Sequence, residues 1–233
     1  MHNVDFPYDQ FSFISDSIFT GLPESDLMIL KKNMITHNYR KNEIIFREGT
    51  YPNGIFLLNE GRAKKYKTDK NGKEQIFYIC KNGELLGYHA LVSGEKYFDS
   101  ACAMESSIIS FIPKDDFFKV LNESSILKQR LLKAISHEFG VLVNFIILLA
   151  QRTVRERLAL SLLILRDKFK PEIQKTPVEL NISREDLSKF VGTARETLGR
   201  LLHDFKEEGL ITINGRIIIL KNPDKLSKIA NIL

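Results

Sequence analysis

The stretch SREDLSKFVGTARETLGRLL, residues 183–202, decides the fold of the C-terminal part of the chain. It contains Ser-x-x-Asp at 183–186 and Thr-x-x-Glu at 193–196, and both have the spacing of a capping box at a helix N-terminus. Gly192 lies between the two predicted helices and permits a sharp turn. We therefore predict two short helices joined by a glycine turn, which is the helix-turn-helix arrangement.

The second predicted helix has two unlike faces. Its apolar side chains recur at i, i+3, i+4 and i+7, the pattern of a helix that packs on a core: Leu198, Leu201, Leu202 and Phe205. Its other face is polar or small: Arg195, Glu196, Gly199, Arg200 and His203. Arginine can donate two hydrogen bonds to guanine, and glutamate can accept one from cytosine, so this face suits base reading in the major groove of DNA. The alternative is an ordinary solvated face on which Glu196 only caps the helix.

Two features around this stretch agree with contact to a polyanion. The strand-like runs 211–213 and 216–220 flank Asn214-Gly215, a strong hairpin signal, and such a hairpin would form a wing beside the two helices. Residues 151–233 hold 16 Lys+Arg against 11 Asp+Glu, which accounts for the whole net charge of +5. Lysine and arginine gain free energy by releasing counterions from phosphates.

The chain before this region reads as a β-structure followed by a long helix. Between residues 42 and 113, apolar runs of strand length alternate with glycine turns, and Asn71-Gly72 predicts a hairpin between 62–68 and 74–79. This pattern indicates a β-barrel or jelly roll. Residues 6–35 are predicted to be helical, with a helix that opens at Leu22-Pro23-Glu24.

From residue 124 to residue 151 a single helix is predicted, about 42 Å long at 1.5 Å per residue. Its apolar seam has coiled-coil-like spacing, with Glu138 at the intervening position. Burial of this seam against a second copy predicts a homodimer. The seam residues are Leu131, Ile135, Leu142, Phe145 and Leu149.

Composition sets outer limits on what the protein is. The chain has 233 residues, 43% hydrophobic and 27% charged, which is ordinary for a folded protein and excludes a disordered or collagen-like chain. The longest uncharged apolar run, 139–150, is shorter than the roughly 20 residues that a membrane span needs. The N-terminus lacks the pattern of a secretory signal. We therefore expect a cytoplasmic protein with no membrane contact.

The quoted residues resemble a known family. FVGTARETLGRLL at 190–202 is similar to the recognition motif of the cyclic-AMP receptor protein/FNR (Crp/Fnr) family of transcription regulators. The glycine-punctuated run from FREG at 46–49 to GELLG at 83–87 looks like the cyclic-nucleotide-binding β-roll of that family. The resemblance covers nearly the whole chain in the family's order. It implies an α+β fold with three parts: a sensor β-roll (jelly roll) at 1–123, a dimerisation helix at 124–151 and a winged helix-turn-helix at 152–233.

The resemblance also implies roles for individual residues. Arg195, Glu196 and Arg200 match the positions that read a TGTGA-like half-site, and Ser183 and Thr193 match positions that contact phosphates. Ala194 departs from a frequent serine, so one phosphate contact is in doubt. The implied partners are double-stranded DNA with an inverted repeat, a second copy of the chain and, for an activator, RNA polymerase.

The sensor pocket is where the sequence departs from the family pattern. Cyclic-nucleotide-binding members carry a glutamate for the ribose and an arginine for the cyclic phosphate. Alignment through Ser100-Ala101 places Tyr88 at the glutamate position and Asp99 at the arginine position. A carboxylate repels a phosphate that faces it, so we predict that cyclic AMP does not bind. The sequence does not identify another effector. The residues expected around this pocket are Gly87, Tyr88, His89, Phe98, Asp99, Ser100 and Ala101.

Other chemistries remain as alternatives or are excluded. The iron–sulfur members use cysteines near the N-terminus, but the first cysteine here is Cys80, so no cluster and no metal site are expected. His89 lies near the position of a heme ligand in heme-binding members, and a heme- or cyclic-nucleotide-responsive regulator is therefore the alternative. An allosteric module without DNA binding is the alternative from another class, which the winged-helix pattern disfavours. Cys80 and Cys102 are expected to be buried apolar residues or, less simply, redox-sensing thiols. The sequence lacks nucleotide-binding, hydrolase and zinc-protease motifs, so we expect no catalytic residues and no enzyme.

Overall fold

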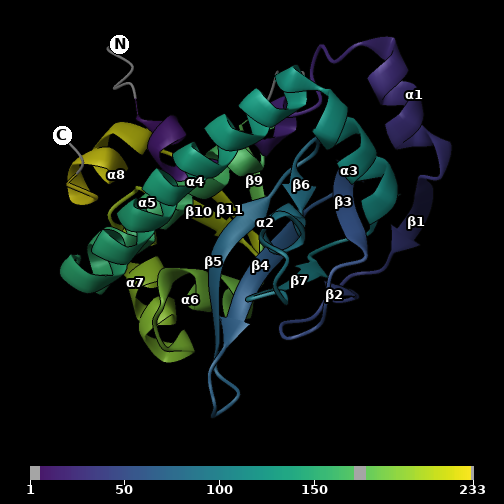
Figure 1. The fold of residues 1–233 in the computed structure, drawn as a ribbon. Coiled ribbons are helices and arrows are strands. Elements are labelled where there is room, and N and C mark those ends of the chain that lie inside the picture. Colours follow the sequence, from purple (N-terminus) through teal and green to yellow (C-terminus); the bar gives the residue numbers. More distant parts are fainter. Residues whose placement is uncertain (1–5, 171–176, 232–233) are drawn as a thin grey trace. The chain divides into compact units, whose positions relative to one another are not determined.

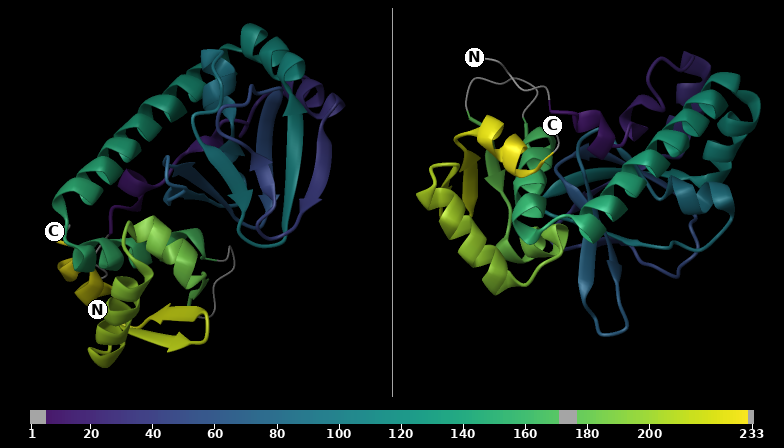
Figure 2. Two further views of the ribbon diagram at one scale, coloured as in Figure 1. Left: turned by 90° about the horizontal axis from the view of Figure 1, so that it is seen from below. Right: turned by 90° about the vertical axis from the view of Figure 1, so that its left-hand side faces the viewer.

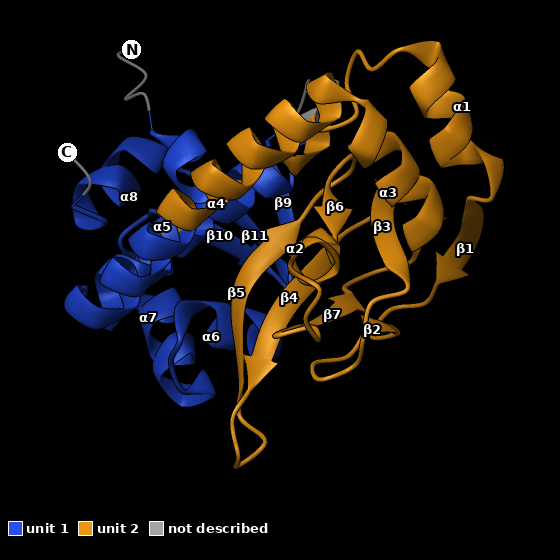
Figure 3. Ribbon diagram, viewed as in Figure 1, with its two compact units in different colours: residues 1–12, 142–233 blue, residues 13–141 orange. Residues whose placement is uncertain are grey.

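The computed structural model describes residues 6–170 and 177–231. It separates into two compact units, one of residues 13–141 and one that combines residues 1–12 with residues 142–233 (Figure 3). The expected loop at 170–177 lies mostly outside the described residues, as do the first five residues of the N-terminus.

The unit of residues 13–141 is a β-roll made of two antiparallel four-stranded sheets (Figure 1). One sheet has the order β1-β8-β3-β6 and the other β2-β7-β4-β5. The strands of the first sheet are β1 (Ile35–Tyr39), β8 (Ser107–Pro113), β3 (Gly54–Glu60) and β6 (Leu85–Leu86). The strands of the second are β2 (Ile44–Phe46), β7 (Ser100–Ala103), β4 (Ala63–Thr68) and β5 (Glu74–Cys80). The helices of this unit are η2 (Ser15–Ser17), α1 (Glu24–Lys32), α2 (Tyr88–Ser93), α3 (Lys114–Glu123) and the first part of α4 (Ser125–Gln151).

The predicted roll and its central hairpin are confirmed. β4 and β5 pair in antiparallel register from Ala63↔Cys80 to Thr68↔Glu74, and their turn protrudes from the roll (Figure 1). Gly72 in this turn has φ +79°, a conformation in which a side chain would be strained. The expectation of helix over residues 6–35 holds only in part. Regular helix is limited to α1 and two short 3₁₀ turns, and the chain enters β1 at Ile35.

Helix α4 is present over 27 residues, as predicted, and its first part belongs to the core of the roll. Leu127, Leu131 and Ala134 are buried in the cluster that also contains Ile55 and Phe117. The described part of the chain contains one helix long and apolar enough to cross a membrane, and it is α4, by length and composition only. Its side chains in the roll core give α4 a partner within its own chain.

The predicted seam on α4 is partly wrong. Leu131 is 4% exposed and Phe145 6% exposed, so both pack inside the protomer and cannot form an open face. Ile135, Leu142 and Leu149 are half-buried. The large apolar side chains that α4 leaves most exposed lie about 100° away around the helix: Leu132, Phe139 and Ile146, at 68%, 71% and 65% exposure.

The other unit is a helical domain with a small sheet (Figure 2, where its hairpin is yellow). It contains η1 (Tyr8–Phe11), the end of α4, α5 (Val154–Lys168), β9 (Glu179–Asn181), α6 (Arg184–Val191), α7 (Arg195–Glu207), β10 (Ile211–Asn214), β11 (Ile217–Leu220) and α8 (Pro223–Ile229). Its three strands pair in the order β10-β11-β9. Helix α5 begins at a complete capping box, since the side chain of Thr153 and that of Glu156 each accept from the other's backbone N–H. This cap supports the predicted break between α4 and α5 after Gln151.

Candidate nucleic-acid interface

Helix α6 begins as the sequence predicted. The hydroxyl of Ser183 accepts from the backbone N–H of Asp186 at 2.9 Å and donates to Oδ2 of the same residue at 2.7 Å. At the other end Gly192 has φ +71° and ψ +48°, the left-handed conformation that ends a helix in a sharp turn. The Ser183 hydroxyl is thus occupied within its own helix cap.

Helix α7 begins one residue later than the capping-box pattern indicated. Its N-cap is Ala194, which has no side chain able to cap, and the helix runs from Arg195. Thr193 therefore lies outside the helix, half-buried, in the turn before it. The first turn of α7 lacks a side-chain cap, so its backbone N–H groups can receive an anion such as a phosphate.

The two faces of α7 are those predicted. Leu198, Leu202 and Phe205 are buried, and Leu201 is half-buried. Arg195, Glu196, Gly199, Arg200 and His203 are exposed on the opposite side. A Cβ atom added at Gly199 would meet no described atom within 4 Å.

The predicted wing is present and is tied to α6. β10 and β11 pair from Ile211↔Leu220 to Asn214↔Ile217, so the turn consists of Gly215 and Arg216, one residue later than predicted. The guanidinium group of Arg184, in the first turn of α6, donates to the backbone oxygen of Gly215 at 3.2 Å. Sequence reasoning missed this contact because it joins residues 31 positions apart.

A hollow of about 390 Å³ lies between α7 and the hairpin. Three of its lining residues are cationic, namely Arg184, Arg195 and Lys206, and His203 lies beside them. None of its described lining residues is acidic. Helix α7 and the hairpin thus border a basic concave surface, and such a surface attracts phosphate groups.

Arg157 holds the helix-turn-helix to the start of α5. Its Nε donates to the backbone oxygen of Val191 and its Nη2 to that of Gly192, both at 3.0 Å. Its Nη1 donates to the backbone oxygen of Arg152 at the end of α4, also at 3.0 Å. One guanidinium group therefore joins the α4–α5 joint to the turn that precedes α7.

The interior of the roll holds charged side chains that pair with one another. Nζ of Lys65 lies 3.4 Å from Oδ2 of Asp99, and both side chains are 5% exposed. Burial, the largest single influence, would lower the pKa of Lys65, but Asp99, Cys80 and Glu138 together outweigh it and the pKa is raised. The ring of Phe13 stacks on Tyr78 at a centroid distance of 3.6 Å, with Nζ of Lys65 5.6 Å from its centre.

A second buried network joins α2 to α4. The hydroxyl of Tyr88 donates to Oε1 of Glu138, and Nε2 of His89 lies 2.7 Å from Oε2 of the same carboxylate. Glu138 is 1% exposed. Burial raises the pKa of Tyr88 and lowers the pKa of His89. Glu138 thus holds the two residues that open α2.

Because of these contacts, the polar groups of the expected sensor residues are paired with other side chains of the roll. Tyr88 is buried, but its hydroxyl is bound to Glu138, and Asp99 is paired with Lys65. Phe98 is 45% exposed, and its ring meets that of His89 edge-on at a centroid distance of 6.2 Å. Gly87 caps α2 with φ +82°, while Ser100 and Ala101 are buried in strand β7.

The residues present do not fit a cyclic phosphate or a heme ligand well. A cyclic phosphate at the position given by the alignment through Ser100-Ala101 would face the Asp99 carboxylate, whose ion-pair partner is Lys65. His89 presents its Nε2 to Glu138 rather than to an open position. Among the described residues, no three His, Cys, Asp or Glu side chains gather in a way that could hold a metal ion. Cys80 and Cys102 are both buried.

Two family models match the chain in the order of these features. The cyclic nucleotide-binding domain matches residues 36–124, and the Crp-like helix-turn-helix domain matches residues 156–229. A β-roll joined through a long helix to a winged helix-turn-helix defines a class of DNA-binding transcription regulators rather than of enzymes. The chain belongs to the Crp/Fnr family of transcription regulators.

Individual relatives agree with this assignment. The regulatory protein HlyX of Actinobacillus pleuropneumoniae is 28% identical over 207 residues, which are 88% of this chain and 84% of HlyX. The fumarate and nitrate reduction regulatory protein of Escherichia coli K12 is 27% identical over 210 residues, 90% of this chain and 82% of that protein. FixK2 from Bradyrhizobium japonicum has the same fold, with a TM-score of 0.74 and 22% identity, over 84% of this chain and 96% of that one. A CRP/FNR-family regulator from Thermus thermophilus gives a TM-score of 0.71 at 21% identity, over 84% and 98% of the two chains.

Proposed function

We propose that this protein is a homodimeric, cytoplasmic transcription regulator that binds an inverted repeat with TGTGA-like half-sites, and that its roll does not take cyclic AMP. The proposed domains are a sensor roll at 1–123, a dimerisation helix at 124–151 and a DNA-binding domain at 152–233. The observation that carries DNA binding is the exposed polar face of α7, bordered by the basic hollow beside the wing.

Base reading falls to Arg195, Glu196 and Arg200. All three are exposed, and they stand on the face opposite the buried leucines of α7. Gly199 supports this role, because glycine within a helix costs about 1 kcal/mol relative to alanine and no described atom lies within 4 Å of a Cβ built there. A close approach of DNA explains a glycine that the fold itself does not require.

Phosphate contacts fall to Thr193 and the first turn of α7. Thr193 stands in the turn, ahead of N–H groups that no side chain caps. Ser183 is the weaker member of the pair, since its hydroxyl already donates to Asp186 and would have to turn away to donate to a phosphate. Its remaining contribution is as an acceptor and as the cap that positions α6.

The dimer forms through the exposed face of α4. Leu132, Phe139, Val143 and Ile146 follow one another at spacings of 7, 4 and 3, the a/d pattern of a coiled-coil seam. Such a run of large apolar side chains is an interaction site in a soluble protein. The half-buried Ile135, Leu142 and Leu149 flank this face, whereas Leu131 and Phe145 support it from inside the protomer.

Selection of binding sites from random DNA tests the proposed function. We expect an inverted repeat whose half-site centres are about one helical turn apart, since a two-fold dimer places its two α7 helices at that distance. Sites without inverted symmetry would contradict the proposal. If the protein activates transcription, RNA polymerase is its further partner.

Sedimentation velocity tests the dimer. Phe139→Glu places a charge in the middle of the seam and should shift the protein from dimer to monomer at micromolar concentration. Asn38→Glu, at an exposed position of strand β1, introduces the same charge away from α4 and should leave the dimer intact. A wild-type monomer, or a Phe139→Glu dimer, would contradict the assigned face.

Calorimetry with cyclic AMP and cyclic GMP tests the sensor. We expect no cyclic-AMP binding tighter than about 100 μM, because a missing charged hydrogen bond forfeits about 1.5–3 kcal/mol and each 1.4 kcal/mol is a factor of ten. Tight, saturable binding would contradict the alignment of Asp99. An absorption band of added heme that His89→Ala abolishes would favour the heme-responsive alternative instead.

A further inference from the structure

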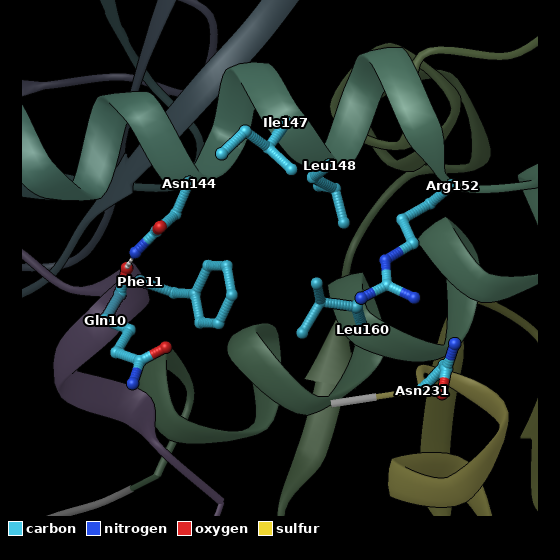
Figure 4. Close-up of a pocket in the computed structure, with 8 residues that line it drawn as sticks. All are labelled: Gln10, Phe11, Asn144, Ile147, Leu148, Arg152, Leu160 and Asn231. Carbon is cyan, nitrogen blue, oxygen red and sulfur yellow. Dashed lines mark hydrogen bonds between the residues drawn. The ribbon is translucent and has the colours of Figure 1, made fainter. Parts of the chain in front are cut away.

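A cavity of about 200 Å³ lies in the helical unit, beside the joint between α4 and α5 (Figure 4). Its walls come from four segments that are distant in sequence: η1, the end of α4, α5 and the residues after α8. Drug-sized ligands need about 300–1,000 Å³, so this cavity fits a smaller molecule.

The cavity has an apolar side and a polar side. Phe11, Leu148 and Leu160 form the apolar side (Figure 4). The polar side includes Arg152 and Asn231, and the guanidinium group of Arg152 points from the end of α4 toward Leu160 (Figure 4). Apolar walls with a few convergent polar groups are the usual form of a small-molecule site.

The residues that line the cavity carry a net positive charge. None of the eight described residues that line it is acidic, and Arg152 is its one cation. The nearest carboxylate to this guanidinium group is that of Glu156, whose Oε1 is 3.7 Å from Nη1. The other oxygen of Glu156 accepts from the N–H and the hydroxyl of Thr153, each at 2.7 Å. Arg152 therefore keeps donors available for an anion.

The N-terminal side of the cavity is fixed in place. Nδ2 of Asn144 donates to the backbone oxygen of Gln10 at 2.9 Å, and the ring of Phe11 meets that of Phe145 edge-on at 5.9 Å. These contacts hold η1 against the end of α4, so the cavity is a built feature of the unit.

We propose that this cavity binds a small organic carboxylate. The carboxylate group pairs with Arg152 and accepts a hydrogen bond from the amide of Asn231, while a short apolar body lies against Phe11, Leu148 and Leu160. Arginine suits this role because its planar fork of donors matches both oxygens of a carboxylate.

The site adds a second level of control, which rests on the proposed DNA-binding function. The side chain of Arg152 lines the cavity, and its backbone oxygen accepts a hydrogen bond from Nη1 of Arg157 at 3.0 Å. Arg157 also holds the backbone oxygens of Val191 and Gly192, in the turn before α7. A ligand that moves Arg152 thus acts on the residue that positions the recognition helix, and its binding changes the affinity for DNA.

Calorimetry on the full-length protein without DNA tests the binding site. The probes are hexanoate and benzoate, with 1-hexanol as the uncharged counterpart of hexanoate. We expect saturable binding of the acids and at least about tenfold weaker binding of the alcohol, from the loss of a charged hydrogen bond. Arg152→Gln should weaken hexanoate binding to the same extent, and Asn231→Asp, which places a carboxylate in the cavity, should also weaken it.

Arg47→Gln, an exposed arginine of the roll, makes the same change elsewhere and should leave hexanoate binding as in the wild type. Circular dichroism of each variant shows whether the fold is retained. Absence of saturable acid binding, equal binding of hexanoate and hexanol, or full binding by folded Arg152→Gln would each overturn the site.

Fluorescence anisotropy with the selected DNA tests the coupling. Saturating hexanoate should change the dissociation constant of the wild-type protein for DNA, and should not change that of Arg152→Gln. An unchanged wild-type constant would overturn the regulatory role. Failure of the proposed function appears separately, as absence of selective DNA binding by the protein without any probe.

Discussion

The DNA-binding domain and the interior of the roll use the same types of charged residue in opposite ways. On α7, Arg195 and Arg200 are exposed to solvent. Inside the roll, Lys65 and Asp99 are buried and neutralise each other, and the carboxylate of Glu138 is held by two residues of α2. A buried charge has to be paired within the fold, whereas an exposed one is available to a partner. The first region thus presents its charges to solvent, and the second pairs its charges with residues of the same fold.

Lys65→Met should give the largest effect, because it leaves the buried carboxylate of Asp99 without its cation. Breaking one side of a buried ion pair costs about 3–5 kcal/mol of unfolding free energy. Urea unfolding followed by near-UV circular dichroism of the tyrosines measures it, as the chain has no tryptophan. The double variant Lys65→Met/Asp99→Leu should recover most of the loss in unfolding free energy. A Lys65→Met variant as stable as the wild type would contradict the view that the buried charges of the roll depend on one another.

Arg200→Ala should affect DNA binding and leave stability unchanged. Loss of a bidentate base contact costs about 1–3 kcal/mol and relaxes specificity at one base pair. Lys206→Ala, in the hollow beside the wing, should instead weaken binding equally on all sequences and reduce its salt dependence. Titration of wild-type and mismatched operators at two salt concentrations separates the two effects. Equal loss on all sequences for Arg200→Ala would remove it from base reading.

Acidification should destabilise the roll through His89. Burial holds the pKa of His89 below its ordinary 6.5, while Glu138, Asp99 and Lys65 face it from the surrounding elements. As the pH falls below about 6.5 the unfolded chain takes up the proton first, so the unfolding free energy falls, by at most about 1.4 kcal/mol per pH unit for one group. The decrease ends below the pKa of the folded state.

His89→Gln should remove this part of the pH dependence. The measurement is the difference between the unfolding free energies of the wild type and the variant, from about pH 7.5 to about pH 5. The groups that the two proteins share cancel in this difference to first order. A difference that does not change with pH would show that His89 does not titrate between these limits.

Gly199→Ala should give the smallest effect on stability. It should raise the free energy of unfolding and lower the affinity for DNA. Alanine should raise helix stability by about 1 kcal/mol or less, since a Cβ at this position meets nothing within 4 Å. The same methyl group should weaken binding to the selected DNA, because it would stand between Glu196 and Arg200 on the face that enters the groove. Parallel unfolding and anisotropy measurements show both signs. Unchanged DNA affinity would mean that the glycine has no role at the interface.

Features that depend on interactions between neighbouring residues could be predicted from the amino-acid sequence. The Ser183 cap, the Gly192 turn and the buried positions of α7 could be predicted because capping and helical periodicity act over one or two turns. The β4–β5 hairpin followed from Asn71-Gly72, since a tight turn fixes the register of its own strands. Thr193 shows the limit of such patterns, because a capping-box spacing does not say which residue of the turn becomes the N-cap.

Features that depend on residues far apart in the chain could be seen only in the folded protein. Apolar residues stand next to one another along α4, as at Leu131 and Leu132, so its sequence could not show that the roll buries Leu131 and leaves Leu132 and Phe139 exposed. The pairings inside the roll join residues 34 and 50 positions apart, Lys65 with Asp99 and Tyr88 with Glu138. Such pairs form because the fold removes them from water at the same place, and a charge in an apolar interior is tolerated only where an opposite charge or a hydrogen bond meets it.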